Sequence, residues 1–149
     1  MFEDLIEEAA RLLHPERVGD RLFGDVASVL VTESGAHHGG VCIDTGSGTG
    51  FCAEASAIAA MVTAGERRIV RIVAVWRDPV TGELAVLPPC GRCRLFIAQM
   101  HPGNRATDVV LGVDASATVD ELLPGLDWPE PLPPRFTRPV GTDASSAGA

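Results

Sequence analysis

The feature that most constrains the fold is a nearly uninterrupted apolar segment at 68–76, which contains the run Ile69-Val70-Arg71-Ile72-Val73-Ala74-Val75. A strand in which polar and apolar side chains do not alternate is typical of a sheet that helices cover on both faces. The segment therefore predicts a buried strand within an α/β fold.

Further helices and strands alternate along the rest of the chain. The pattern predicts helices at 2–13, 52–64, 90–100 and 118–123, and strands or extended segments at 26–32, 40–44, 68–76, 84–87 and 108–113. Alternation of this kind is typical of the α/β class, with helices on both faces of one sheet. We expect a single domain over 1–128, followed by a loosely packed Pro/Gly/Ala-rich tail over 129–149.

The composition excludes several classes of function. All twelve basic residues are arginine, so chemistry that needs a lysine Schiff base or a phosphate-loop lysine is impossible. A net charge of −8 argues against a nucleic-acid partner. The acidic start Met1-Phe2-Glu3-Asp4 is unlike a signal peptide, and no apolar run reaches the roughly 18 residues of a membrane span. We therefore expect a cytoplasmic protein with a small-molecule substrate and no membrane partner.

The residues best suited to chemistry lie at the starts of two predicted helices. Cys52 and Glu54 begin one of them, and Cys90 and Cys93 begin the other. The first turn of a helix favours the thiolate that a metal ion needs. Three cysteine ligands with one open position would be typical of a catalytic zinc site. Glu54, in an otherwise apolar helix, would then have a partner and a task as a general acid and base.

Other interpretations of the cysteines stay open. A Cys-x-x-Cys pair is commonly a structural metal site or a redox pair, and four cysteines could also form two disulfides. The additional Cys52 and Glu54 favour the catalytic zinc site. The glycine-rich segment 46–50 resembles a dinucleotide-binding fingerprint only superficially, because its third glycine comes too early, and we expect a flexible loop there.

Two segments resemble a known zinc signature. Cys52-Ala53-Glu54 and Pro89-Cys90-Gly91-Arg92-Cys93-Arg94 are similar to the signature of the cytidine deaminase superfamily. The first ligand is cysteine rather than histidine, which within the superfamily points to small cytidine deaminases and blasticidin-S deaminases. Val26-Ala27-Ser28, His101-Pro102-Gly103 and Glu121-Leu122-Leu123-Pro124 look closest to blasticidin-S deaminases.

The resemblance implies a three-layer α/β/α sandwich with a mixed five-stranded sheet, assembled as a homotetramer. It also implies that zinc on the three cysteines activates water for attack on C4 of a cytosine ring, while Glu54 transfers protons and ammonia leaves. The substrate would be cytidine, deoxycytidine or a cytosine nucleoside antibiotic such as blasticidin S. The backbone at Ala53 and near Pro88 would hold the ring edges. Arg92 would hydrogen-bond the thiolates, unless it is an exposed helix arginine.

The expected sugar-binding positions depart from the family pattern. Cytidine deaminases carry Asn-x-Glu on the second strand, where this chain has Cys42 and Asp44. Asp44 could accept a hydrogen bond from a hydroxyl group, whereas Cys42 lacks the functions of an amide and is favoured as a buried small hydrophobe. Phe51 and Trp128 are candidates for the aromatic side chain beside the substrate, since Phe23 falls one position from the expected place.

These departures leave two alternatives to a cytosine nucleoside deaminase. One is a deaminase of another aminated heterocycle, and the other is a zinc-stabilised scaffold without catalysis. His37 and His38 are expected in a solvated turn. Arg67, Arg68 and Arg71 are expected at a solvated strand edge or a subunit contact.

Overall fold

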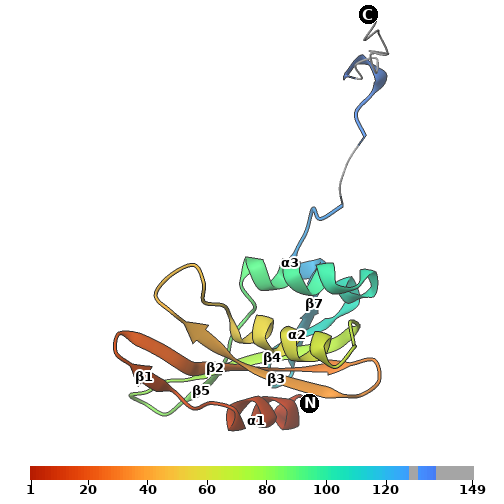
Figure 1. Ribbon diagram of the computed structural model, residues 1–149. Coiled ribbons are helices and arrows are strands. Elements are labelled where there is room, and N and C mark those ends of the chain that lie inside the picture. The colour runs from red at the N-terminus through yellow and green to blue at the C-terminus, as the bar shows by residue number, and fades with distance from the viewer. Residues whose placement is uncertain (128–130, 137–149) are drawn as a thin grey trace, which may run out of the picture.

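The computed structural model of the chain describes residues 1–127 and 131–136, and a seven-stranded sheet forms its middle layer (Figure 1). The strands are β1 (Glu16–Val18), β2 (Arg21–Thr32), β3 (His37–Asp44), β4 (Ile69–Arg77), β5 (Leu84–Val86), β6 (Asp108–Gly112) and β7 (Ala115–Thr118). Helix α1 (Glu3–Arg11) covers one face, and α2 (Ala53–Thr63) and α3 (Gly91–Met100) cover the other. This arrangement confirms the predicted α/β class.

The sheet is mixed. One edge of β2 pairs with β3, and its opposite edge pairs first with β1 and then with β4. The far edge of β4 pairs with β5 and β6, and β6 pairs with β7. Within the described residues, β4 and β6 form the parallel pair, and the other pairs are antiparallel.

The expected number of five strands was wrong, because β1 and β7 add to the segments that the sequence predicted. All three residues of β1 are exposed, and β7 has two exposed and two half-buried residues. Strands with so few buried side chains carry no apolar pattern that a sequence could reveal. They form because they extend hairpins with β2 and β6.

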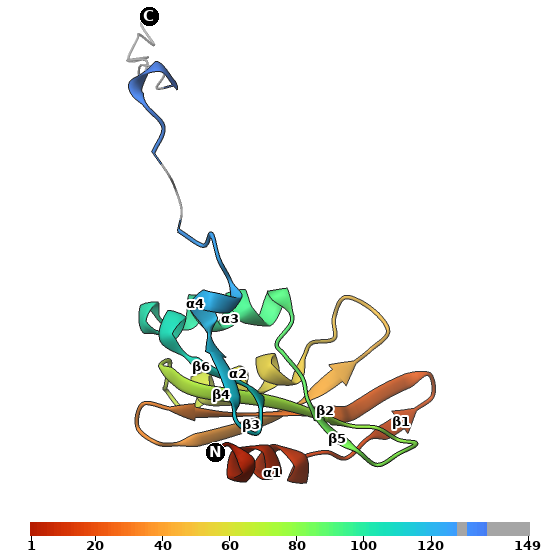
Figure 2. The ribbon, with the colours of Figure 1, turned by 180° about the vertical axis from the view of Figure 1, so that it is seen from behind.

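Strand β4 contributes to two separate cores, which explains its nearly uninterrupted apolar sequence. Val73 and Val75 pack with the α1 side chains, whereas Ile69 and Ile72 pack with those of α2 and α3. Figure 2 shows these layers from behind, with α1 on one side of the sheet and α3 on the other. Burying one such aliphatic side chain contributes about 1.5–3 kcal/mol, so both helical layers depend on this strand.

A bulge divides β2. Its register with β3 shifts between Phe23 and Ala27, and Gly24 has a positive φ of 70°. A Cβ atom at Gly24 would lie 2.7 Å from the backbone oxygen of His14. A larger residue would therefore be strained both by this contact and by the positive φ. The strand begins at Arg21 rather than at the expected position 26, because the bulge interrupts the apolar pattern.

Gly40 sets the distance between α2 and β3. A Cβ atom at Gly40 would lie 2.3 Å from the backbone nitrogen of Ala57, so the absence of a side chain lets the helix rest directly on the strand. The position of α2 on the sheet, and therefore of the residues at its start, depends on this contact.

The paired histidines belong to β3 rather than to the expected turn. Nδ1 of His37 lies 2.8 Å from a carboxylate oxygen of Glu8, and Nε2 of His38 lies 2.8 Å from one of Glu66. Arg71 forms an ion pair of 2.9 Å with Asp108 and lies over the Phe2 ring.

The C-terminal part of the domain consists of short elements. The 3₁₀ helix η1 (Pro102–Ala106) follows α3, and α4 (Val119–Leu122) begins with a capping box between Thr118 and Glu121. A further 3₁₀ helix, η2 (Pro134–Phe136), lies in the described part of the tail. Among residues 1–127 and 131–136, no helix is both long enough and apolar enough to cross a membrane.

Candidate active site

The starts of α2 and α3 bring three cysteines together. Cys52 is the N-cap of α2, Cys90 is the N-cap of α3, and Cys93 lies in the first turn of α3. The three sulfur atoms lie within 4.8 Å of one another, and those of Cys52 and Cys90 are 3.7 Å apart. The structure therefore places the three predicted metal ligands in one cluster.

Backbone hydrogen bonds fix the chain just before Cys52. Phe51 and Ile43 exchange two hydrogen bonds of 3.0 Å, which attach the entrance of α2 to the end of β3. Because Cys52 follows Phe51 directly, this bridge sets where its sulfur lies.

Arg94 fixes the chain before Cys90. Its Nε donates to the backbone oxygen of Pro89 over 2.8 Å, and its Nη1 donates to that of Leu122 over 2.9 Å. The half-buried guanidinium thus joins the loop before α3 to the end of α4. The sequence analysis missed this role, since no pattern in the sequence identifies carbonyl groups as partners for an arginine.

The donor set fits a zinc ion. Two sulfurs that each lie about 2.3 Å from a tetrahedral zinc are about 3.8 Å apart, close to the 3.7 Å between Cys52 and Cys90. All four cysteines are free, so the alternative of two disulfides was wrong. Three sulfur ligands leave a fourth coordination position open, which is typical of a catalytic zinc site.

The thiols influence one another's ionisation. Burial opposes ionisation of Cys90, but hydrogen bonds from the Cys93 backbone N–H and from the other two thiols lower its pKa overall. Burial raises the pKa of Cys52 and of Cys93, and the Glu54 charge raises that of Cys93 further. The cluster by itself therefore favours one thiolate, and a cation is needed to stabilise three.

Glu54 lies beside the cluster in the first turn of α2, with only 6% of its surface exposed. Burial raises its pKa, although its own backbone N–H and the Cys93 thiol act in the opposite direction. A raised pKa keeps the protonated carboxyl available closer to neutral pH, as a group that both gives and takes protons requires.

A cavity of about 200 Å³ adjoins the cluster. Its wall contains Glu54 and two of the three cysteines, and its lining residues are Val26, Cys42, Cys52, Ala53, Glu54, Ala74, Leu87, Pro88 and Cys90. Two residues expected near the ring edges, Ala53 and Pro88, are among them. The sequence analysis missed Val26, Ala74 and Leu87, which look like ordinary core residues of their strands.

The other expected substrate contacts differ in position. Cys42 lines the cavity and donates its thiol proton to Asp25 over 2.8 Å, so it is more than a small hydrophobe. Asp44 is exposed, and it accepts a hydrogen bond of 2.8 Å from the Gly46 backbone N–H. Phe51 is half-buried, and its described contacts are those of the backbone bridge. Trp128 lies outside the described residues.

Arg92 is exposed on α3, and within the described residues it forms no hydrogen bond to a thiol. The contact expected between Arg92 and the sulfurs is thus not formed here. The backbone N–H of Cys93 points to the Cys90 sulfur instead. This N–H group at the start of α3 lowers the pKa of Cys90.

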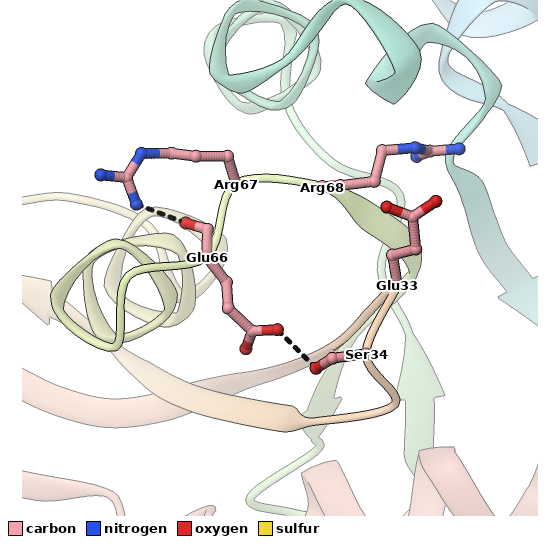
Figure 3. Close-up of a pocket in the computed structure, with 5 residues that line it drawn as sticks. All are labelled: Glu33, Ser34, Glu66, Arg67 and Arg68. Atoms are coloured by element: carbon pink, nitrogen blue, oxygen red, sulfur yellow. Dashed lines mark hydrogen bonds between the residues drawn. The ribbon is translucent and has the colours of Figure 1, made fainter.

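A polar pocket lies near the opposite end of α2, between the β2–β3 turn and the loop before β4 (Figure 3). Its lining residues are Glu33, Ser34, Glu66, Arg67 and Arg68. Glu66 accepts hydrogen bonds from Thr32, Ser34 and His38, which connect the turn to the loop. These bonds assign the pocket a structural role, separate from the cysteine cluster.

Solved structures of other proteins share this fold. Cytidine deaminases from Mycobacterium tuberculosis (a point mutant) and Burkholderia pseudomallei match with TM-scores of 0.67 and 0.65, at 22% and 24% identity. Each match covers 84% of this chain, together with 96% and 98% of the respective structure.

Sequence comparison identifies the family. The chain is 31% identical to a blasticidin-S deaminase of Bacillus cereus, over 67% of this chain and 86% of the relative. It is 32% identical to a cytidine deaminase of Halalkalibacterium halodurans, over 81% of this chain and 89% of the relative. No model of a protein family matches the chain. Because both relatives are matched over most of their length, the chain belongs to the family of hydrolytic deaminases that includes cytidine and blasticidin-S deaminases.

Proposed function

We propose that this deaminase hydrolyses the exocyclic C–N bond of a free cytosine nucleoside, releases ammonia, and depends on zinc held by Cys52, Cys90 and Cys93. The observation that carries the proposal is the position of Glu54, a buried carboxyl group in the same small cavity as the converging thiols. The names of the relatives supply the candidate substrates, which are cytidine, deoxycytidine and blasticidin S.

The residues of the cavity have different roles in the reaction. When bound, zinc would supply Lewis-acid polarisation of the attacking water. Glu54 takes a proton from that water and gives it to ring N3, and then moves the remaining proton of the added hydroxyl group to the amine nitrogen, so that ammonia leaves. One water is consumed and one ammonia is released, so a carbonyl group replaces the amine. The Ala53 backbone N–H and the carbonyl near Pro88 hold the edges of the ring.

The size of the cavity fits the reacting ring of the substrate. Its volume of about 200 Å³ is below the roughly 300–1,000 Å³ of a pocket that encloses a complete ligand. The cavity therefore encloses the reacting ring, while the rest of the substrate lies at its mouth. The chain's net charge of −8 opposes binding of a polynucleotide.

The homotetramer and the cytoplasmic location are part of the proposal. The tetramer is expected from the family resemblance, and sedimentation velocity of the purified chain tests it. A species of four times the 15.6 kDa chain mass is the expected result, and a monomer at micromolar concentration would contradict it.

The decisive experiment is an ammonia-release assay over a panel of aminopyrimidine and aminopurine nucleosides, with metal analysis of the same sample. We expect about one zinc per chain and turnover of cytosine nucleosides. Glu54→Gln is expected to keep the zinc and to lower kcat by about 10²–10⁴-fold, the usual contribution of a general acid–base group.

Each other outcome has a defined meaning. Full activity of Glu54→Gln would contradict the role of Glu54. Turnover of other heterocycles alone would show that the substrate is not a cytosine nucleoside. Bound zinc without any turnover would favour a zinc-stabilised scaffold without catalysis.

A further inference from the structure

The bulge in β2 brings Asp25 behind Cys42, which lines the catalytic cavity. The β2–β3 register moves from Phe23–Ile43 to Ala27–Val41, so three residues of β2 face the single residue Cys42. Bulges re-aim side chains and are common beside active sites. Here the bulge places Oδ1 of Asp25 2.8 Å from the sulfur of Cys42, which lines the cavity together with Glu54.

Asp25 is a half-buried carboxylate with little to neutralise it. Its hydrogen-bond partner is a thiol, which is a weak donor, and within the described residues no arginine forms an ion pair with it. Asp25 also lines a second cavity of about 630 Å³, together with Arg17 and Arg77. Neither guanidinium lies within 4 Å of the carboxylate, so neither forms an ion pair with it, and the Asp25 carboxylate is the group directly behind Cys42.

The hydrogen bond fixes which side of Cys42 faces the substrate. Burial raises the pKa of the thiol, and so does the neighbouring Asp25, so Cys42 keeps its proton and donates it to the carboxylate. With its proton directed toward Asp25, the sulfur presents lone pairs to the cavity. The wall at Cys42 is therefore an acceptor with a negative charge directly behind it.

We propose that Asp25, acting through Cys42, makes the site select cytosine nucleosides by the charge of their substituents. A positively charged substituent is preferred to a neutral one, and a neutral one to a phosphate. Asp25 is thus a positioning residue that determines specificity without touching the reacting atoms. The inference rests on the proposed function, because it assumes that the cavity holds a cytosine ring.

The test compares substrates that differ in charge. We would measure kcat and KM for cytidine, for its 3′-amino and 5′-amino analogues, and for the 3′- and 5′-monophosphates. For Asp25→Asn, the ratio of kcat/KM between amino analogue and monophosphate should fall about tenfold, which corresponds to about 1.4 kcal/mol. The change should lie in KM rather than in kcat. High salt should weaken the preference of the unmodified chain in the same direction.

Two further variants separate specificity from folding. Asp20→Asn removes the same charge from the same β1–β2 hairpin, but the Asp20 side chain is 86% exposed and has no described hydrogen bond to a residue of the cavity, so the ratio should not change. Asp25→Ser removes the charge while keeping a small polar side chain, in case the asparagine variant does not fold.

A ratio within twofold of the unmodified value in folded Asp25→Asn or Asp25→Ser would overturn the inference. If the unmodified chain released no ammonia from any cytosine nucleoside, the proposed function would fail instead. Dissociation constants of the same probes, measured by calorimetry, would then still show whether Asp25 sets a preference for charge.

Discussion

At the scale of single residues, the role of Cys90 as a metal ligand can be tested separately from its role as a helix N-cap. Cys90 is exposed and is the N-cap of α3, and its sulfur is a weaker acceptor than an oxygen atom would be. Serine is a better N-cap residue than cysteine, because its hydroxyl oxygen accepts from the free backbone N–H groups of the first turn. Cys90→Ser is therefore expected to keep the helix while removing a thiolate ligand.

For Cys90→Ser we expect the zinc content after dialysis to fall about tenfold or more, with far-UV circular dichroism unchanged. Metal analysis and circular dichroism of the same sample check this. Retention of one tightly bound zinc per chain would show that Cys90 is not a ligand.

Glu66 predicts a specific dependence of stability on pH. Hydrogen bonds from Ser34, His38 and Thr32 lower its pKa from 4.5 to about 2. The unfolded chain therefore binds the proton first as the pH falls, and the stabilisation from Glu66 is complete above about pH 4.5 and lost by about pH 2. Urea unfolding should show Glu66→Gln less stable than the unmodified chain at pH 6, with the difference shrinking toward pH 2.5.

Glu33→Gln is the matched control for this prediction, because Glu33 lines the same pocket and its side chain is exposed (Figure 3). A difference between Glu66→Gln and the unmodified chain that stayed constant from pH 6 to pH 2.5 would exclude the proposed linkage.

At the scale of elements, the sequence predicted those parts that have a clear period or a clear start. The apolar run at 68–76 indicated β4, and Cys52 and Cys90 stand directly before α2 and α3. The sequence could not predict β1, because all side chains of this strand are exposed. Nor could it predict the bulge at Gly24, because the bulge depends on a backbone contact with His14. The Asp25–Cys42 hydrogen bond follows from that bulge and was equally hidden.

The candidate metal site was predictable only in part, for the same reason. The three cysteines and Glu54 could be identified from spacing, because each helix start was visible in the sequence. The hydrogen bonds of Arg94 that hold the loop before Cys90 could not be identified in this way. Their acceptors are the carbonyl groups of Pro89 and Leu122, which lie on separate segments.

Arg94 and Arg92 give a direct test of this difference. Arg94→Ala removes both hydrogen bonds that hold the loop before Cys90, and hydrogen bonds from a charged group contribute about 1.5–3 kcal/mol each. We expect it to lower the free energy of unfolding by about 3 kcal/mol, the lower end for two such bonds, and to speed zinc transfer to a chelator by about tenfold. Stopped-flow absorbance with a zinc indicator measures the transfer rate.

Arg92→Ala should have the smaller effect on both quantities, because Arg92 is exposed and makes no described contact with the sulfurs. If Arg92→Ala had a larger effect on zinc transfer than Arg94→Ala, this would support the role in stabilising the thiolates that the sequence suggested for Arg92.

At the scale of the whole molecule, the sulfur cluster adds a second link between α2 and α3, which also share a hydrophobic core. Cys52 belongs to the start of α2, whereas Cys90 and Cys93 belong to the start of α3. A zinc ion bound by all three would cross-link two helices of one layer. The first layer, formed by α1, has its own core on the other face and does not contact the cluster.

Zinc removal is therefore expected to destabilise the domain without unfolding it. A ligand present at about 1,000 times its Kd stabilises the folded state by about 4 kcal/mol, and each kcal/mol shifts Tm by about 2–4 °C in a domain of this size. We expect chelation to lower Tm by roughly 10 °C and zinc, but not magnesium, to restore it, since thiolates bind zinc in preference to hard cations. Scanning fluorimetry measures both steps, and Cys90→Ser should not respond to either. An unchanged Tm on chelation of the zinc-loaded chain would mean that the ion does not link α2 to α3.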